Sequence, residues 1–365
     1  MTRNNRHGHW QSVRACYGRP DVATASGRLA LSLTRRGVSS LPFPLASPSR
    51  LVVSQHGRRV KVRPYLLLAF LALVWGTHWP VSKIGLRDIP PFTYGVMRVF
   101  TGLVVVLVVL AARRRLRLPD RHDVPVALSV GLGQMAAGIA IMNLALPLIS
   151  AGRASVLVFT MPLWVALIEL GRLRRTPAGW QLVGLLAGLV GIVTLLDPQA
   201  IDWGSGGPVI GSAALLVSAV IWAATTIHIR RHQWRGTPLD LMPWQLLVAL
   251  VPLAVASLIM ETGRPIHWEP SAVAAVLYSG PLATAVAFVV SQSISRSLSP
   301  FATTMGFLAV PVVGLISSSV LLSEPLTMLD LAGATMTFLG IVVVAIATTD
   351  QARDTTTQSV PVRAE

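Results

Sequence analysis

The chain has almost no cysteine and few charged residues. Cys16 is its only cysteine, which excludes an intramolecular disulfide, a cysteine-ligated metal centre and an iron–sulfur cluster. Charged side chains make up 13% of the 365 residues, about half of the ~25% that is typical of a soluble domain. They gather at the chain ends and in short clusters, so the sequence does not describe a water-soluble domain.

Several catalytic patterns are missing as well. The sequence holds no glycine-rich nucleotide-phosphate loop, no His-Glu-x-x-His motif, no Gly-x-Ser-x-Gly elbow and no pair of acidic residues inside an apolar run. Direct use of ATP, zinc-dependent hydrolysis and acyl transfer depend on such groups. We therefore expect that the protein is not an enzyme and uses no cofactor or metal ion.

The net charge of +16 is concentrated near the N-terminus. Residues 1–64 hold 12 of the 31 Lys and Arg residues and one acid, Asp21, which leaves a net charge of +5 for the remainder. Basic loops beside a membrane explain that balance, so we expect no nucleic-acid partner. We predict that residues 1–64 are a disordered basic extension. The alternatives are an organelle transit peptide or a natural translation start near Val60.

What the chain does contain is long apolar runs. Hydrophobic residues make up 53% of it and the mean hydropathy is +0.62. The runs approach the ~20 residues that cross a bilayer, and they lack the alternation of barrel strands. We predict an all-α polytopic membrane protein with a disordered tail at 349–365. Its ten transmembrane helices should cover residues 65–83, 92–112, 125–146, 152–171, 179–196, 208–229, 241–260, 271–293, 300–321 and 329–348.

Part of the sequence occurs twice. Residues 130–196 match residues 279–345 at a constant shift of 149 without a gap. The shift superimposes four notable pairs: Gly131 and Gly280, Pro162 and Pro311, Gly184 and Gly333, and Asn143 and Gln292. Internal duplication is common among secondary transporters, whose substrate sites lie between the halves.

The duplication divides the ten spans into domains 65–196 and 208–348. Because five spans is an odd number, the second domain must enter the membrane from the opposite face, which gives inverted repeats. Pro162 and Pro311 should then bend their helices at matching depths.

Basic residues in the links predict the orientation. The links on one side carry 12 Lys and Arg residues, whereas those on the other side carry four, Lys83, Arg87, Arg153 and Arg264. Basic loops favour the cytoplasm. Both termini should therefore be cytoplasmic, in a multi-pass protein of the cell (inner) membrane.

Three motifs together resemble one family. The first span reads Trp-Gly-Thr-His-Trp-Pro-Val-Ser-Lys at 75–83, the second follows Pro90-Pro91 and contains Arg98, and Glu324-Pro325-Leu326-Thr327 precedes the last. Their order and spacing over residues 65–348 resemble the drug/metabolite transporter superfamily, specifically proteins with two EamA domains. The resemblance implies a carrier that exports a metabolite, amino acid or drug-like compound by alternating access, with proton antiport or exchange.

The two halves also depart from this pattern. Arg175 stands where a shift of 149 places the counterpart of Glu324. A shift of 147 relates Trp75 to Trp222, but it places Ala223 at the position of Gly76. The halves therefore need not contribute equally to a site.

Polar and aromatic residues inside the apolar spans are the candidate substrate-binding residues, since a charged side chain in hydrocarbon costs roughly 3 kcal/mol on insertion scales. Arg98 would donate to a substrate carboxylate or phosphate, unless its side chain extends to the outer headgroups or binds backbone carbonyls of a broken helix. His78 would bind a proton or substrate, unless it only packs. The amides would contact substrate or only join helices, and the tryptophans would wall a pocket or fill the core. The candidates are Trp75, His78, Arg98, Gln134, Asn143, Trp222 and Gln292.

Four residues near the span ends are candidates for gating or coupling: Lys83, Glu169, His228 and Glu324. Lys83 and Glu324 should lie near the outer face, either as two separate solvated charges or as the salt bridge of an outer gate. Glu169 and His228 should lie near the cytoplasmic face, either at the interface or in an inner gate. Proton coupling would depend mainly on His78 or Glu169.

Two functions compete with the carrier hypothesis: a channel and a non-transporting membrane scaffold. A channel should line a continuous pore with rings of like polar groups, whereas the polar residues here are scattered, which favours a carrier. The expected partners are a small-molecule substrate and the lipid bilayer. A homodimer through the fifth and tenth spans is left open.

Overall fold

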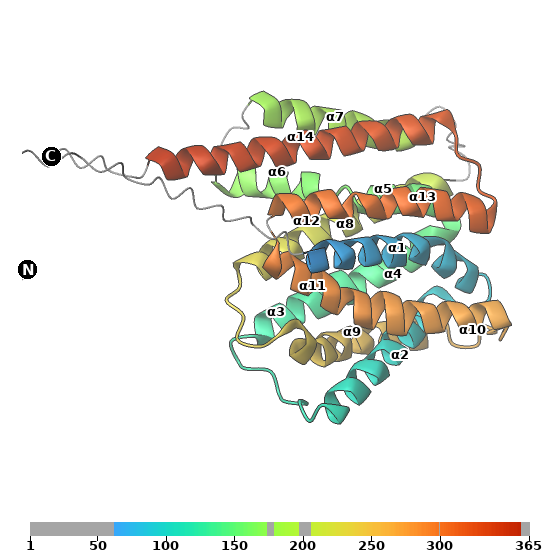
Figure 1. Cartoon of the computed structure of the whole chain (residues 1–365). Helices are drawn as coiled ribbons and strands as arrows, with labels where there is room; N and C mark the ends of the chain where they lie inside the picture. The colour runs from blue at the N-terminus through green and yellow to red at the C-terminus, as the bar shows by residue number, and fades with distance from the viewer. Residues whose placement is uncertain (1–61, 174–178, 197–205, 299, 359–365) are drawn as a thin grey trace, which may run out of the picture. The chain divides into compact units, whose positions relative to one another are not determined.

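The computed structural model describes residues 62–173, 179–196, 206–298 and 300–358 (Figure 1). These residues form helices joined by short links, without a strand among them. Nine helical stretches are long and apolar enough to cross a membrane, and a shorter apolar helix covers Gly179–Leu195. The prediction of an all-α membrane protein of about ten spans is confirmed. The predictions for residues 1–61 and for Arg175 lie outside the described residues.

Six of the spans are single helices, and four are interrupted. The single helices are α1 (Val62–Gly85), α2 (Pro91–Ala112), α7 (Gly179–Leu196), α8 (Gly207–Arg231), α9 (Pro238–Met260) and α14 (Met328–Gln358). The third span consists of α3 (Val124–Ser129), η1 (Val130–Ala137), α4 (Gly138–Ala145) and η2 (Leu146–Leu148). The other interrupted spans are α5 (Ala151–Val158) with α6 (Met161–Leu173), α10 (Pro270–Leu277) with η3 (Tyr278–Val286) and α11 (Ala287–Ser297), and α12 (Pro300–Phe307) with α13 (Ala309–Leu322).

Helix α14 continues to Gln358, beyond the last apolar span and into the segment 349–365 for which the sequence predicts disorder. Adding one residue to an existing helix forms a hydrogen bond without a new nucleation step. A polar segment that follows an apolar helix can therefore extend it.

Both repeats contain a π-helix at the same place. η1 (Val130–Ala137) and η3 (Tyr278–Val286) coincide at the shift of 149. Each packs on a neighbour through a glycine: a Cβ on Gly280 would lie 2.5 Å from the Arg98 carbonyl oxygen, and one on Gly131 would lie 2.7 Å from that of Gln245. π-helical turns often mark functional sites. Here each packs against a helix of the other repeat, η1 against α9 and η3 against α2.

The two spans that contain the repeat-related prolines Pro162 and Pro311 are interrupted where the sequence predicts bends. Helix α5 ends at Val158 and α6 begins at Met161, just before Pro162. In the second repeat α12 ends at Phe307 and α13 begins at Ala309, just before Pro311. Proline cannot donate the backbone hydrogen bond that would continue the helix. The prediction of breaks at matching depths is confirmed.

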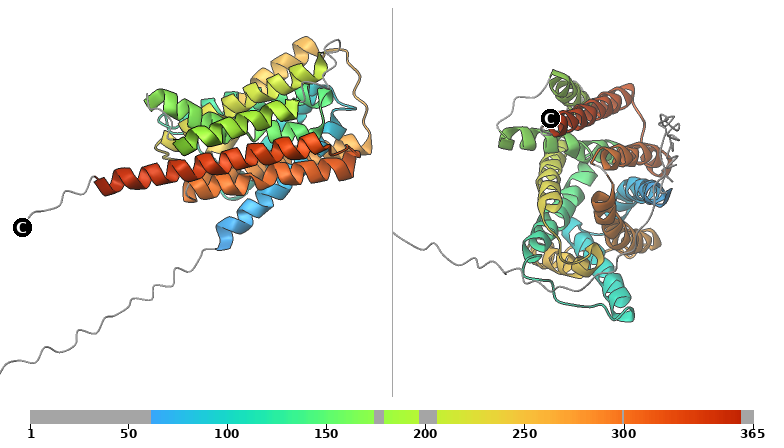
Figure 2. Two further views of the ribbon diagram at one scale, coloured as in Figure 1. Left: turned by 90° about the horizontal axis from the view of Figure 1, so that it is seen from above. Right: turned by 60° about the vertical axis from the view of Figure 1, so that its left-hand side comes forward.

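Helices α7 and α14 pack against each other at one edge of the described bundle (Figures 1 and 2). A Cβ on Gly184 would lie 2.8 Å from the carbonyl oxygen of Gly340, and one on Gly191 would lie 2.7 Å from that of Gly333. The shift of 149 relates Gly184 to Gly333 and Gly191 to Gly340. Equivalent residues thus exchange partners across an antiparallel helix pair, which is the arrangement of two inverted repeats around a two-fold axis.

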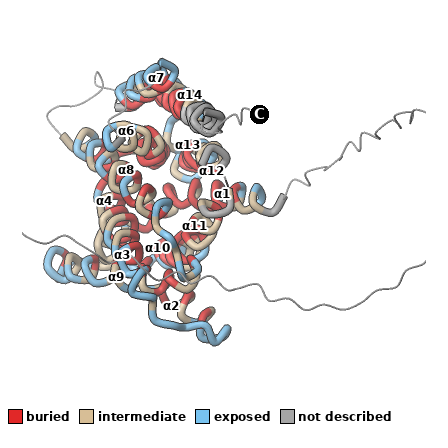
Figure 3. Tube along the Cα trace, turned by 90° about the vertical axis from the view of Figure 1, so that its left-hand side faces the viewer, coloured by how far each residue is buried: buried red, intermediate tan, exposed pale blue. Residues whose placement is uncertain are grey.

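Buried residues line the inward faces of the helices, and exposed residues lie outside (Figure 3). Many of the exposed side chains are large and apolar, such as Val108, Leu258 and Val320. Exposure of such an apolar surface to water would cost free energy, whereas contact with the hydrocarbon tails of lipids would not. We call the end of the bundle that contains Glu324 and links 86–90 and 261–269 the Glu324 end. The opposite end, with links 113–123 and 232–237, is the Asp123 end.

Candidate functional site

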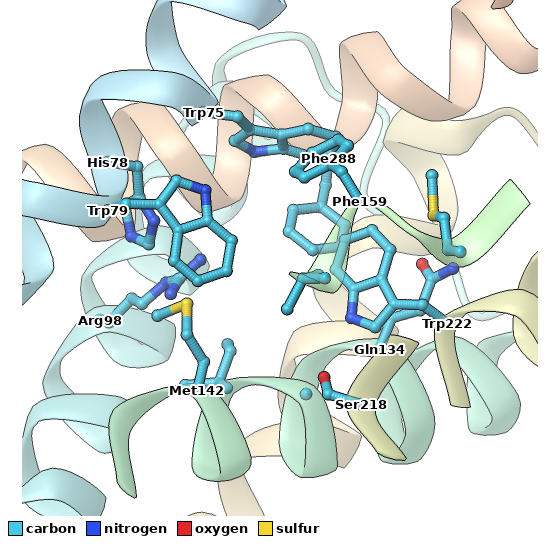
Figure 4. A pocket seen from close by; sticks show the side chains of 14 residues that line it. Trp75, His78, Trp79, Arg98, Gln134, Met142, Phe159, Ser218, Trp222 and Phe288 are labelled. Atoms are coloured by element: carbon cyan, nitrogen blue, oxygen red, sulfur yellow. The ribbon is translucent and has the colours of Figure 1, made fainter. Parts of the chain in front are cut away.

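A cavity lies inside the bundle between the two repeats (Figure 4). Helices α1, α2, α4, α5, α6, α8 and α11 and the π-helix η1 contribute to it. Its lining combines aromatic and apolar side chains with a few polar ones: Trp75, His78, Trp79, Arg98, Gln134, Gly138, Ile139, Met142, Val158, Phe159, Met161, Ser218, Trp222 and Phe288. A mostly apolar cavity with few polar groups is the usual form of a small-molecule site.

Trp75 is the centre of the aromatic part of the lining. Its ring centroid lies 5.4 Å from that of Phe288, 5.9 Å from that of Trp222 and 6.5 Å from that of Phe159. Its Nε1 donates to the backbone oxygen of Ala283 in η3 over 2.9 Å, which fixes the ring. The repeat-related pair Trp75 and Trp222 therefore meets edge to face at the cavity, a favourable aromatic geometry.

Arg98 carries the only guanidinium in that lining. Its residue is 4% exposed, and its Nε donates to Thr284 Oγ1 over 2.7 Å. Its Nη1 has no hydrogen-bond partner among the described residues. The alternative of a side chain extended to the headgroups was therefore wrong, because α2 directs Arg98 inward. A buried guanidinium with an unused donor is costly unless an acceptor arrives.

His78 and Gln134 also reach the cavity. His78 is buried, and its Nε2 lies 2.9 Å from Ser82 Oγ, one turn along α1. Gln134, in η1, donates weakly to Thr226 Oγ1 of α8 over 3.4 Å. Trp79, which is not among the candidates from the sequence, is buried and lines the cavity as well. It was missed because an aromatic residue near a helix end is also typical of an outer aromatic belt.

Asn143 and Gln292 are repeat-related but do not line the cavity. Asn143 Nδ2 donates to the Pro91 oxygen at the start of α2 over 2.9 Å, and Gln292 Nε2 donates to Gln245 Oε1 over 3.0 Å. Both amides thus join helices, as the simpler alternative proposed. The sequence analysis missed Gln245. The shift of 147 that relates Trp75 to Trp222 makes Gln245 the counterpart of Arg98, and this signal could have identified it.

Lys83 and Glu324 meet at the Glu324 end. Lys83 Nζ lies 2.7 Å from Glu324 Oε1 and donates to the Ile149 oxygen over 2.6 Å. The other carboxylate oxygen accepts from the Ala151 N–H over 2.8 Å and from the Ser318 hydroxyl. The alternative of two separate solvated charges was wrong. The first turn of α5 presents free N–H groups, which attract the carboxylate and bring it to the lysine.

Glu169 and His228 lie at the Asp123 end. Glu169 Oε2 pairs with Arg231 Nη2 at 2.5 Å, and His228 Nδ1 lies 2.8 Å from Ser129 Oγ. Each contact joins a helix of the first repeat to α8. None of the four gating candidates lines the cavity.

A cluster of His122, Asp123 and His232 stands out at the same end. Their ligand atoms all lie within 4.8 Å of one another. Asp123 also accepts from the backbone N–H groups of Arg235 and Gly236. Burial raises the pKa of Asp123, but the hydrogen bonds from His232, Gly236 and Arg235 lower it, and the net shift is downward. The sequence analysis missed this cluster because 109 residues separate Asp123 from His232.

Comparisons with known proteins agree with the architecture. The sequence profile of the EamA-like transporter family matches residues 63–196 and 209–346. The uncharacterised transporter YoaV of Bacillus subtilis is 27% identical over 284 residues, 77% of this chain and 96% of its own length. A protein of Salmonella typhimurium named "Probable amino-acid metabolite efflux pump" is 27% identical over 75% of this chain and 92% of its own.

A solved crystal structure shares the fold. It covers 80% of this chain and 98% of its own, with a TM-score of 0.57 and 21% sequence identity. The two profile matches confirm the internal duplication and cover most of the chain. Two inverted helical repeats surround a central cavity, and each repeat matches the same profile; the chain therefore belongs to the EamA-like transporter family.

Proposed function

We propose that this membrane transporter exports a small organic solute that carries a carboxylate on an apolar body. The solute binds in the central cavity, with its carboxylate on Arg98 and its apolar part among Trp75, Trp222 and Phe288. One observation carries the proposal: Arg98 is buried and keeps a donor, Nη1, without a partner in the described part of the chain. The name of the Salmonella relative, an amino-acid metabolite efflux pump, supports this class of solute.

Alternating access follows from the two ends of the bundle. By the distribution of basic residues, the Asp123 end faces the cytoplasm. Lys83 and Glu324 then form part of an outer gate that must separate before a solute leaves outward. Glu169 and Arg231 belong to the corresponding inner contacts. The breaks in α5–α6 and α12–α13 let parts of these spans move without melting whole helices.

Export in this proposal is driven either by proton antiport or by exchange of solutes. His78 is the ionisable side chain beside Arg98 in the cavity lining, and Ser82 holds its Nε2. Two cations in one buried cavity repel when no anion is present, so a carboxylate on Arg98 would favour a proton on His78. This pair therefore favours exchange of one solute for another over proton antiport.

The test is ligand binding to the detergent-purified chain. A panel of aromatic and branched aliphatic carboxylates, each with its neutral amide analogue, is screened by thermal shift. The parent protein should prefer at least one acid over its amide by about tenfold or more, the size of a charge-assisted hydrogen bond. Arg98→Gln should abolish that preference.

The matched control is Arg153→Gln, because Arg153 lies outside the cavity and already pairs with Asp330 at 3.0 Å. It should leave the acid preference unchanged. An acid that binds Arg98→Gln as tightly as it binds the parent would overturn the role of Arg98. In proteoliposomes, saturable uptake stimulated by counter-substrate indicates a carrier, whereas flux linear in concentration indicates a channel.

A further inference from the structure

The cluster at the Asp123 end joins the two repeats. His122 and Asp123 precede α3 in the first repeat, and His232 follows α8 in the second. His232 Nε2 lies 3.0 Å from Asp123 Oδ1, and His122 Nδ1 lies 3.6 Å from the same oxygen. The imidazole centroids are 4.7 Å apart. Two imidazole nitrogens and a carboxylate oxygen therefore converge on one point.

The spacing suits a small first-row cation. Zinc bonds to nitrogen and oxygen of about 2.0–2.1 Å at tetrahedral angles place neighbouring ligand atoms about 3.4 Å apart. The two separations from Asp123 Oδ1, 3.0 and 3.6 Å, lie on either side of that value. The third edge, between the two imidazole nitrogens, is at most 4.8 Å, and the His122 side chain, which is 39% exposed, has room to turn toward the ion. That exposed side also gives an ion its entry path and a water molecule the fourth position.

Neighbouring backbone N–H groups already hold the Asp123 carboxylate in place. Asp123 is fully buried. Its Oδ2 accepts from the Gly236 N–H over 2.7 Å, and the Arg235 N–H is shared between its two oxygens at 3.2 Å each. Oδ1 is also the oxygen nearest the two imidazoles. Groups that orient a ligand in this way strengthen metal binding. The nearby guanidinium of Arg235 is paired with Asp120 at 3.1 Å, and that of Arg231 with Glu169.

We propose that His122, Asp123 and His232 bind a divalent first-row cation, of which Zn²⁺ fits the ligands best. The ion replaces the proton between His232 Nε2 and Asp123 Oδ1, and that proton passes to solvent. Since the ligands come from both repeats, the bound ion holds the Asp123 end closed. The consequence for transport depends on the proposed carrier function: a carrier held closed at one end stops, so the ion inhibits.

Binding is tested first and does not depend on transport. Zn²⁺ is titrated by calorimetry into the full chain purified without a histidine tag, and Co²⁺ serves as a spectroscopic probe of tetrahedral nitrogen ligands. His122→Ala and His232→Gln should each weaken the Zn²⁺ affinity by ~100-fold or more. His232→Gln keeps an amide donor for Asp123, and His122 is exposed, so both variants should fold.

Two matched controls separate this cluster from other histidines. His267 is exposed at the Glu324 end, and His228 has its Nδ1 engaged by Ser129. His267→Ala and His228→Ala should each change the affinity less than threefold. The histidines in residues 1–61 are present in every protein compared, so their contribution cancels. Equal Zn²⁺ titrations for the parent and for a folded His122→Ala/His232→Gln protein would overturn the site.

The second arm concerns regulation. In proteoliposomes loaded with a carboxylate identified by the binding screen, Zn²⁺ on the side of the Asp123 end should reduce transport by the parent at least tenfold. It should leave the double variant unaffected. Equal inhibition of both proteins would overturn the regulatory role and leave the site in place. Absence of any transported carboxylate would count against the carrier proposal, while the binding arm would still decide the metal site.

Discussion

Different chemistry holds the two ends of the bundle. At the Glu324 end, carboxylates meet backbone N–H groups in the first turns of helices: Glu324 binds the Ala151 N–H, and Glu261 binds those of Phe92 and Thr93 at 2.9 and 2.7 Å. At the Asp123 end, carboxylates pair mostly with arginines. The Arg231 and Glu169 side chains are 42% and 28% exposed, compared with 22% and 16% for Lys83 and Glu324.

The difference has energetic consequences. An exposed ion pair contributes about 0–1 kcal/mol, because water competes for both charges. A carboxylate that also satisfies the first N–H groups of a helix contributes ~1–2 kcal/mol more, because those groups have no partner within the helix. The Glu324 end is therefore the firmly held end. Asp123 is the exception at its own end, since it is buried and accepts two backbone N–H groups.

The largest effect should come from removing Glu324. Glu324→Ala leaves the Ala151 N–H and a mostly buried Lys83 without their partner. We expect a loss of ~2–3 kcal/mol in the free energy of unfolding. Removing one partner of a partly buried ion pair leaves the other charge desolvated and without compensation. Denaturant unfolding of the purified protein in detergent measures it.

Glu324→Gln serves as the control for charge. The amide oxygen still accepts from the Ala151 N–H, so this variant should lose only about half as much stability. A cysteine placed in link 86–90 should also become more reactive toward a membrane-impermeant reagent in Glu324→Ala. Unchanged stability and unchanged labelling in Glu324→Ala would show that the Glu324 end is not the firmly held one.

A smaller effect is expected at Glu261, which caps α2. Its carboxylate accepts from two backbone N–H groups and from the Thr93 hydroxyl over 2.8 Å, and the residue is 6% exposed. Glu261→Ala should reduce the unfolding free energy by ~1–2 kcal/mol, the usual loss of a good helix cap. The matched control is Glu269→Ala at the start of α10, where the side chain makes no capping bond. Equal losses in the two variants would contradict the capping role of Glu261.

The architecture was predictable because lipid imposes strict conditions. A transmembrane span needs a long apolar run, and only a helix forms all its backbone hydrogen bonds within a single segment. The duplication could be read residue by residue, so the matched breaks before Pro162 and Pro311 could be predicted as well. The matched π-helices could not, since their sequences, VGLGQMAA and YSGPLATAV, differ in most positions.

The candidate site was only partly predictable, because composition does not fix helix rotation. Gln134 and Asn143 lie nine residues apart in one span, about two and a half turns of an α-helix. Such residues face opposite sides, and the structure places only Gln134 at the cavity. Contacts between distant segments could not be predicted from the sequence, since 241 residues separate Lys83 from Glu324. Their pairing depends on how the helices pack, and that packing also positions the His122–Asp123–His232 cluster.

The smallest effect should be found at the Asp123 end, in the pair of Glu169 and Arg231. Glu169→Gln should change the unfolding free energy by less than ~1 kcal/mol, and high salt should reduce even that difference, because these side chains, 28% and 42% exposed, are more accessible to water than those of Lys83 and Glu324. A double-mutant cycle with Arg231→Gln measures the coupling between the two side chains. A coupling as large as the loss in Glu324→Ala would mean that the two ends are held equally firmly. Alternating access would then need free energy to separate the contacts at both ends. A weak coupling would instead leave the Asp123 end free to open when no cation is bound to its histidines.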